Sequence, residues 1–415
     1  MGLDERLRRL RGHVGAVGSG TERNAPELAP TGPTLTERLG RVRTGRGGSG
    51  RSPDERQLAD ALGAEPIAPG VLILERLLPV RLRHGRVLLG VGAEPRYLPL
   101  PFGCGREADA GAPWVCLDTE TSGLAGGTGT WAFVTGLLHQ GSSGWRLRQF
   151  LLTRLDAEPA YLEALAADLA RPARLLTYNG RAFDAPLLAT RFRLAGRPDP
   201  TTGLPHLDLL APVRRAFGPV WPDCRLATAE SRLLGVNRSD DLPGAAAPQA
   251  WLGWLRRGET APLSGVLRHN RLDLLSLAGL LPALDAVYSE PGAAGADLRA
   301  VAAAHLAGGR PDRALSILAA GIRDLGPEGL LDLARLYRRS GDWPRARAIW
   351  ERLDDSGDPE ARAALARYHE HRSRDLDRAL SLTEALPTSM DRERRRFRLL
   401  TKLDRAAKNP CLDGL

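Results

Sequence analysis

The sequence predicts an α/β domain with a mixed sheet flanked by helices, followed by an all-α region of helical repeats. Two observations lead to this fold class. Between residues 112 and 290, short apolar runs alternate with longer amphipathic runs in the order β-β-β-α-β-α-β, and helices follow. From residue 297 to residue 405 only helical patterns remain, and they recur. A chain of 415 residues has room for about two to three such domains.

The first 111 residues contain two different kinds of segment. Residues 1–62 are rich in Gly, Arg, Pro, Ser and Thr and show no sustained hydrophobic period, which predicts a disordered basic tail. Residues 63–111 carry short apolar runs separated by turn signals. We expect a small β subdomain there, with a hairpin that turns near His84 and Gly85.

The core domain, residues 112–290, is expected to begin with a three-stranded meander. The apolar run at Trp114 predicts a buried strand, and two further strands follow, separated by the turn signal HQGSSG. A helix, a strand, a second helix that ends at Gly196 and a short fifth strand come next. The expected elements cover residues 114–118, 130–138, 145–152, 157–170, 173–179, 184–196 and 206–210.

The C-terminal region, residues 297–405, contains three similar segments: HLAGGRPDRALSIL, LYRRSGDWPRARAIW and YHEHRSRDLDRALSL. Their equivalent residues Ala314, Ala346 and Ala379 stand 32 and 33 residues apart. These steps are close to the roughly 34-residue period of tetratricopeptide repeats. We expect three such repeats, with an irregular helical bundle as the alternative. Stacked repeats form a concave surface, so a protein partner is expected there.

Composition narrows the class of protein. The net charge is +9 and nearly all basic residues are arginine, which suits a polyanionic partner such as nucleic acid. A bias in genome base composition also explains the arginine usage, and both explanations stay open. The four cysteines form no C-x-x-C pair, and we find neither an export signal nor a run of about 18 apolar residues. We expect a cytoplasmic protein without a membrane segment.

Carboxylates occupy three places that packing alone would not favour. Asp118 and Glu120 end the first core strand and share a face, because strand side chains alternate with period two. Asp184 stands at the start of a predicted helix. Asp273 falls, with Asn270, inside the apolar stripe of a long helix, where a charge is costly unless it is paired or bound to a metal.

Four converging carboxylates would repel one another, and divalent cations remove that repulsion. Hard ions such as Mg²⁺ and Mn²⁺ prefer oxygen ligands, and two of them about 4 Å apart can clamp both oxygens of a phosphoryl displacement. We expect two such ions on four ligands: Asp118, Glu120, Asp184 and Asp273. His269 lies four residues before the last carboxylate, on the same helix face, and is the candidate for accepting a water proton.

Each candidate residue also has a structural explanation. Asp184 alone would more often cap its helix, and Asp-x-Glu alone is a weak motif. His269 alone is more often a surface or structural residue. Asp208 is favoured as a strand-end residue over a further site carboxylate. The combination, in this order on this scaffold, is what favours catalysis.

Three segments, LDTETSGL, YNGRAFDAPLL and HNRLD, resemble the exonuclease motifs of the DEDD superfamily of 3′→5′ exonucleases, which has a ribonuclease H-like fold. Longer segments, GGTGTWAFVTGL, PHLDLL, CRLATAESRLLGV and DDLPG, more closely resemble the bacterial YprB-type ribonuclease H-like family. The resemblance covers about Pro66 to Val287, and some members carry a tetratricopeptide tail. It implies a ribonuclease H-like core and metal-dependent hydrolysis of phosphodiester bonds.

The resemblance also implies substrate contacts. By analogy with the superfamily, residues just after the first motif line the pocket for the 3′-terminal nucleotide. With the motif residues around the second and third carboxylates, the expected substrate-binding set is Thr121, Gly123, Leu124, Asn179, Phe183 and Asn270. One departure concerns the base. In the superfamily a base histidine precedes the last Asp by five positions and a base tyrosine by four, and His269 has the spacing of the tyrosine. Asn270, a water network or a histidine that points away are the alternatives.

The sequence therefore predicts a metal-dependent 3′→5′ exonuclease that hydrolyses single-stranded DNA or RNA by a two-metal mechanism. One alternative is a non-catalytic scaffold that binds nucleic acid or protein, and the other is a structure-specific endonuclease on the same fold. The set of four repelling carboxylates argues against the scaffold. A choice between DNA and RNA needs a contact to the 2′-hydroxyl, which the sequence does not locate.

Overall fold

The computed structural model describes residues 54–408 except 90–93, 101–111, 124–128, 142–143, 171–172 and 240. Most of the predicted N-terminal tail lies outside the described residues. Its last part is helix α3 (Glu55–Leu62), so the prediction of a disordered tail is wrong there. Asp54 caps α3, because its side chain accepts hydrogen bonds from the amides of Arg56 and Gln57.

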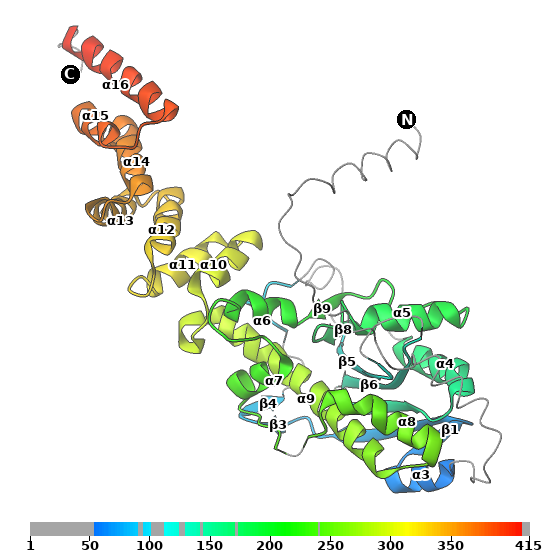
Figure 1. The fold of residues 1–415 in the computed structure, drawn as a ribbon. Helices are drawn as coiled ribbons and strands as arrows, with labels where there is room; N and C mark the ends of the chain where they lie inside the picture. The colour runs from blue at the N-terminus through cyan, green and yellow to red at the C-terminus, as the bar shows by residue number, and fades with distance from the viewer. Residues whose placement is uncertain are drawn as a thin grey trace, which may run out of the picture. The chain divides into compact units, whose positions relative to one another are not determined.

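Seven strands form one mixed sheet in the order β1-β2-β7-β6-β5-β8-β9. Figure 1 shows part of this sheet, with β5, β6 and β8 labelled. β5 pairs antiparallel with β6 and parallel with β8, and β9 continues the parallel part. The mixed sheet flanked by helices that the sequence predicts is therefore confirmed. The strands are β1 (Glu65–Ala68), β2 (Val71–Leu78), β5 (Trp114–Thr121), β6 (Ala132–Gly141), β7 (Gly144–Leu152), β8 (Arg174–Thr177) and β9 (His206–Asp208).

The described residues between 63 and 100 do not form a separate β subdomain, contrary to our expectation for residues 63–111. β2 pairs antiparallel with β7 over its whole length, so β1 and β2 extend the main sheet. Only β3 (Leu82–His84) and β4 (Val87–Leu89) form a separate two-stranded hairpin. This hairpin turns at Gly85, where φ is +60°, a conformation that favours glycine. Local turn signals locate a hairpin but do not reveal which sheet edge a strand joins.

Alternate residues of β5 face two hydrophobic clusters, as the period of a strand requires. Trp114 and Cys116 belong to one cluster, and Val115 and Leu117 belong to the other. Helices α4 (Glu158–Leu169), α5 (Asp184–Leu194) and α8 (Ala247–Arg257) contribute to the second cluster. Helix α6 (Leu210–Phe217) contributes to the first, and α9 (Ala261–Ser289) contributes to both. β5 is therefore covered on both faces up to the point where its carboxylates begin.

The helices of the core domain are α4 (Glu158–Leu169), α5 (Asp184–Leu194), α6 (Leu210–Phe217), α7 (Leu226–Ala229), α8 (Ala247–Arg257) and α9 (Ala261–Ser289). Among the described residues, α9 is the one helix that is long and apolar enough to cross a membrane, whereas we expected no such segment. Leu263, Leu274 and Leu284 are fully buried along α9. It packs as the central helix of the domain.

Seven consecutive helices follow the core domain, and each packs against the next. The three alanines at the predicted repeat positions, Ala314, Ala346 and Ala379, are fully buried. A C-terminal run of packed helices is therefore confirmed, and its assignment to tetratricopeptide repeats stays a prediction. The helices are α10 (Leu298–Ala307), α11 (Pro311–Ala320), α12 (Pro327–Arg339), α13 (Trp343–Asp355), α14 (Pro359–Tyr368), α15 (Leu376–Glu384) and α16 (Met390–Lys408).

Glu370 ties α16 to the turn η5 (His369–Ser373). It is buried, and its carboxylate accepts hydrogen bonds from Arg398 at 2.7 and 2.9 Å and from Lys402 at 2.8 Å. The hydrogen bonds from Arg398 lower the pKa of Glu370 to about 2. Because this pKa lies below the unfolded value of 4.5, the carboxylate stabilises the fold above pH 4.5, and this stability is lost as pH falls towards 2.

We therefore expect Glu370→Gln to lower the free energy of unfolding by about 2 kcal/mol at pH 7, and by progressively less as pH falls from 4.5 towards 2. Urea unfolding at several pH values measures the difference. The control is Glu393→Gln, because Glu393 pairs with Arg392 but its side chain is more exposed than that of Glu370. This variant should lower the free energy of unfolding by at most about 0.5 kcal/mol. A loss from Glu370→Gln that is independent of pH would contradict this electrostatic explanation.

Candidate active site

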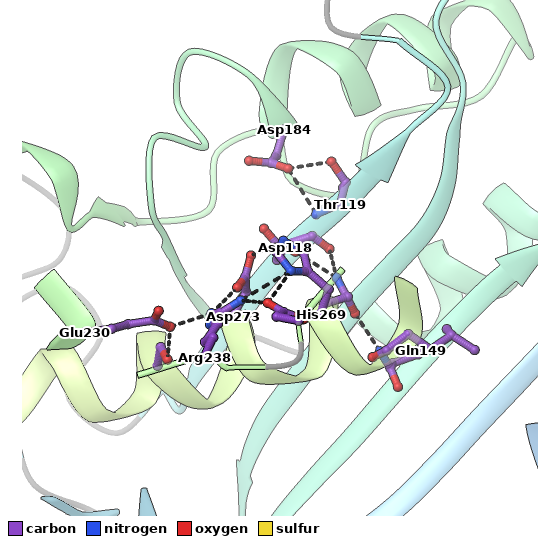
Figure 2. A network of polar contacts seen from close by, with 12 residues as sticks. Asp118, Thr119, Gln149, Asp184, Glu230, Arg238, His269 and Asp273 are labelled. Atoms are coloured by element: carbon purple, nitrogen blue, oxygen red, sulfur yellow. Dashed lines mark hydrogen bonds and ion pairs between the residues drawn. The ribbon is translucent and has the colours of Figure 1, made fainter. Parts of the chain in front are cut away.

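Three elements carry the four predicted metal ligands. Asp118 and Glu120 lie in the last half of β5, Asp184 is the first residue of α5, and Asp273 lies in the middle of α9. Figure 2 shows three of these carboxylates, those of β5, α5 and α9, around the end of β5. Asp184 and Asp273 stand 66 and 155 positions after Asp118 in the sequence, and the fold brings the three residues to one region, as the shared chemistry predicts.

Burial raises the pKa values of all four carboxyl groups, and repulsion by other carboxylates of the set adds to it for Asp118 and Glu120. Burial contributes most for Asp118, and the charges of Asp273, Asp184 and Glu120 raise its pKa further. The pKa of Glu120 is raised by burial and by two of the same neighbours. Burial raises the pKa of Asp184 to about 6, and it also raises the pKa of Asp273. The four side chains therefore form one electrostatic cluster.

Asn270 holds Asp118 in place. Its Nδ2 donates to Oδ2 of Asp118 at 2.8 Å and to the carbonyl oxygen of the same residue at 3.1 Å. Its Oδ1 accepts a hydrogen bond from Nε2 of Gln149, on β7, at 2.8 Å (Figure 2). The side chain of Asn270 is 0% exposed and supports a carboxylate in this structure, and its substrate-binding role stays a prediction.

Gly136 on β6 makes room for this arrangement. A Cβ atom at this position would lie 2.1 Å from Oδ1 of Asn270 and 2.6 Å from Cδ1 of Leu274. We expect Gly136→Ala to displace Asn270 and to destabilise the protein by about 1–3 kcal/mol, measured by urea unfolding. Gly265→Ala on α9 is the control, because a Cβ atom there would lie at an ordinary contact distance of 3.6 Å from Cβ of Leu242. This variant should be neutral or stabilising. Equal stability of the two variants would contradict the expectation.

Arg238 lies among the carboxylates, and the sequence analysis did not single it out. Its Nη2 donates to Glu230 and to Asp273, and its Nη1 donates to Asp241 at 2.8 Å. Glu230, in the π-helical turn η2 (Glu230–Leu234), is 1% exposed and also accepts a hydrogen bond from Ser276. The guanidinium group therefore compensates part of the negative charge of the site.

His269 is oriented by Asp241. Nδ1 of His269 lies 2.6 Å from Oδ2 of Asp241, and Nε2 lies 3.7 Å from Oδ2 of Asp273. Nη1 of Arg238 is 3.3 Å from the same Nδ1, but the shorter contact, to a carboxylate, requires a donor there. The ring then carries its hydrogen on Nδ1 and directs the lone pair of Nε2 towards the carboxylates. His269 does not point away from the site.

Asp184 is held by β5 and does not cap its helix. Its Oδ1 accepts hydrogen bonds from the amide of Thr119 at 3.1 Å and from the hydroxyl of the same residue. The N-cap of α5 is Phe183, and no side-chain cap is formed. Asp208 accepts hydrogen bonds from three backbone amides, at 2.7–3.1 Å, and this fits a strand-end role.

The remaining residues of the predicted substrate-binding set differ in their surroundings. Thr121 donates its hydroxyl hydrogen to the carbonyl of Gly123 at 2.9 Å, and Leu124 lies outside the described residues. Phe183 is 58% exposed directly before Asp184, so its ring is free to contact a ligand. Asn179 adopts a left-handed conformation with φ of +65°.

A cavity of about 500 Å³ opens beside the carboxylate cluster. Its lining includes Asp118 and Asp273 as well as Asn179. Two arginines that the sequence analysis did not single out, Arg214 and Arg225, also line it. A lining that combines carboxylates with arginines suits a metal-bound phosphate ester.

Among residues 54–408, within the described ranges, no group of three or more His, Cys, Asp or Glu side chains is arranged to hold a metal ion. The role of the four carboxylates as metal ligands therefore stays a prediction. Thr119 holds one oxygen of Asp184, and Arg238 holds one oxygen of Asp273. The chemistry of the donors fits a hard divalent cation, because such ions bind carboxylate oxygens.

Comparison with known proteins places the chain in a family. Residues 115–284 match the RNase_H superfamily. Over 280 residues the chain is 32% identical to the uncharacterized protein YprB of Bacillus subtilis (strain 168), and the match covers 64% of this chain and 67% of that protein. The chain belongs to the YprB family. This confirms the resemblance to the YprB-type family and the ribonuclease H-like fold.

Two solved structures are similar to this YprB-family chain at a lower sequence identity. One is a crystal structure of SSB/exonuclease I in complex with an inhibitor, with a TM-score of 0.27, and the other is exonuclease I in complex with an inhibitor, with a TM-score of 0.25. Each is 17% identical and covers 38% of this chain. The chain spans 43% of the length of each of those chains.

The site residues that sequence reasoning missed lie mostly in segments already noted for their family resemblance. Glu230 is in CRLATAESRLLGV, Asp241 is in DDLPG, and Arg238 stands between the two. The sequence feature that could have identified them is their charge, because they lie in or next to segments that resemble the YprB family but are separate from the three carboxylate motifs. Gln149 had no such signal, because it stands in an ordinary strand pattern.

Proposed function

We propose that this YprB-family protein is a metal-dependent nuclease that removes nucleotides from the 3′ end of single-stranded DNA or RNA. The observation that carries the proposal is the cluster of four carboxylates with raised pKa values: Asp118, Glu120, Asp184 and Asp273. Such a cluster destabilises a metal-free protein. A scaffold that only binds a partner would have no use for it.

These four carboxylates would hold two Mg²⁺ or Mn²⁺ ions. When bound, the ions supply a more acidic attacking water and a counter-charge for the leaving oxygen. The chain's own residues prepare this chemistry. Asn270 and Thr119 orient the carboxylates of Asp118 and Asp184 by hydrogen bonds. Arg238 limits the repulsion that these charges impose on the fold.

His269 is the general base in this proposal, and Nε2 accepts the proton of the attacking water. Asp241 supports the role, because its carboxylate accepts the hydrogen of Nδ1 at 2.6 Å and so selects the tautomer with a free Nε2. The same carboxylate stabilises the imidazolium that proton transfer creates. The unusual spacing of this histidine is thus compensated by a partner from a distant segment.

Substrate binding is assigned to the cavity beside the carboxylates. Arg214 and Arg225 would contact phosphates of the strand, since arginine pairs with phosphate in a bidentate manner. The exposed ring of Phe183 would stack on a base next to the cleaved bond. Neither contact reads sequence, so a broad specificity is expected.

A panel of end-labelled oligonucleotides tests the proposal. Single-stranded, duplex and hybrid DNA and RNA, linear and circular, are incubated with wild-type protein in Mn²⁺ or in EDTA, and with Asp184→Asn in Mn²⁺. We expect stepwise shortening from the 3′ end of linear single strands by the wild type in Mn²⁺ only. Intact linear strands that the protein nevertheless binds would favour the scaffold. Cleaved circles would favour the endonuclease.

A further inference from the structure

A second cavity lies in the C-terminal helices. It has a volume of about 330 Å³ and is formed by α12, α13, α14 and η5. Its lining combines arginine side chains with aromatic rings, among them Arg338, Arg367, Arg372, Trp343 and Tyr368. We name this cavity the arginine–aromatic pocket. It contains none of the residues of the candidate active site.

The positive charge of this pocket is largely uncompensated. A further lining arginine, Arg335, forms ion pairs with Asp332 and Glu360. These two carboxylates therefore compensate Arg335 and not the other lining arginines. The side chains of Arg338 and Arg367 make no hydrogen bond or ion pair with any other residue that the structure describes.

Arg367 shows the effect of this crowding. Partial burial lowers its pKa, and the guanidinium groups of Arg395 and Arg338 lower it further. Like charges gathered in this way repel one another until an anion binds between them. The pocket therefore fits a ligand with negative charge.

Aromatic faces distinguish this ligand from a simple anion. The rings of Trp343 and Tyr368 are 6.0 Å apart between centroids, and both side chains are partly exposed. The guanidinium group of Arg372 lies 5.7 Å from the centroid of the Trp343 ring. Flat rings beside arginines are the means by which proteins bind single strands, because bases stack on the rings while the phosphates meet the cations. An acidic peptide would use the charges and leave the rings without a partner.

We propose that the arginine–aromatic pocket is a second nucleic-acid site, which binds a single strand through phosphate contacts to Arg338 and Arg367 and base stacking on Trp343. The choice of a nucleic acid among polyanions rests in part on the proposed function of the same chain. The pocket gives the protein a contact with the strand that does not depend on metal or on catalysis.

Equilibrium binding to a fluorescein-labelled 20-nucleotide single strand tests this site. The full chain with Asp184→Asn is titrated in EDTA, and fluorescence anisotropy is recorded at several salt concentrations. The pocket variant adds Arg338→Gln and Arg367→Gln. The control variant adds Arg339→Gln and Arg352→Gln instead, which remove the same charge from exposed positions of α12 and α13 outside the pocket. Circular dichroism melting confirms that both variants fold.

We expect the pocket variant to bind about tenfold more weakly and the control to stay within about threefold of the parent. The slope of log affinity against log salt should fall by about 1.4 when two phosphate contacts are lost from a single strand. Trp343→Leu, which keeps every charge, should also weaken binding. Equal losses in the pocket and control variants, or unchanged binding in the pocket variant, overturn the proposal. Displacement of the oligonucleotide by polyglutamate of equal charge also overturns it.

The failure of this inference and the failure of the proposed function are distinguishable. Binding in EDTA with an inactive variant requires no hydrolysis. If the wild type degrades no substrate but the pocket variant loses binding selectively, the second site stands and the nuclease proposal falls. If the wild type is a nuclease and the pocket variant binds as tightly as its parent, the second site falls alone.

Discussion

Asp118→Asn is expected to lower phosphodiester hydrolysis at least about a thousandfold, which corresponds to about 4 kcal/mol of transition-state stabilisation. The substitution removes one charge from the proposed metal ligands and keeps the size of the side chain. Its Oδ1 can still accept the hydrogen bond that Nδ2 of Asn270 now donates to the carboxylate. The loss would therefore report the charge and not a collapse of the site. Rates on a labelled single strand in Mn²⁺ measure it.

The same variant should be more stable than the wild type when metal is absent. Burial and the charges of Asp273, Asp184 and Glu120 raise the folded pKa of Asp118 above its unfolded value. A carboxyl group with a raised pKa contributes stability at low pH and loses it as pH rises through the folded pKa. In EDTA we therefore expect the advantage of Asp118→Asn to grow as pH rises from 4 to 8.

The controls for this prediction use metal and a surface carboxylate. Mn²⁺ should raise the melting temperature of the wild type more than that of Asp118→Asn, since only the wild type has the full set of ligands. Asp156→Asn changes an exposed residue paired with Arg154, so its activity and stability should remain close to those of the wild type. Full activity of Asp118→Asn would place the active site elsewhere.

Arg238→Gln is expected to destabilise the protein by about 3–5 kcal/mol, because it leaves buried carboxylates without their cation. Glu230 is 1% exposed and would keep only the hydrogen bond from Ser276. Asp273 and Asp241 would lose the same partner. Urea unfolding in EDTA measures the loss.

The physical cause can be separated from a packing defect in two ways. Burial raises the pKa of Glu230, so acidification neutralises this group, and the penalty should be smaller at pH 5 than at pH 8. The double variant Arg238→Leu with Glu230→Leu should recover part of the stability, because it removes both charges together. Arg257→Gln, at an exposed pair with Glu259, should cost at most about 0.5 kcal/mol. A penalty without pH dependence and without recovery would contradict the charge explanation.

Local sequence patterns are sufficient for several features of this protein. The alternation of side chains along a strand places Trp114 and Cys116 in one cluster and Val115 and Leu117 in the other, and the structure agrees. The helical period of α9 likewise predicted its apolar stripe and the position of Asp273 within it. Carboxylates in such places are costly, which is why a site could be predicted before any geometry was known.

Contacts between distant segments were decided only by the tertiary structure. Asp118 and Asn270 are 152 residues apart, Asn270 and Gln149 are 121 apart, and no local period relates them. The same applies to β2, whose partner β7 turned an expected subdomain into an extension of the main sheet.

Local periodicity and residue type were enough to predict the order of strands and helices in the core domain, the elements that carry the carboxylates and the family resemblance. The support of a carboxylate by Asn270, the orientation of His269 by Asp241 and the partial neutralisation of the cluster by Arg238 became apparent only in the folded chain. Hydrogen bonds and ion pairs act over about 3 Å, and only the folded chain brings such groups within that range.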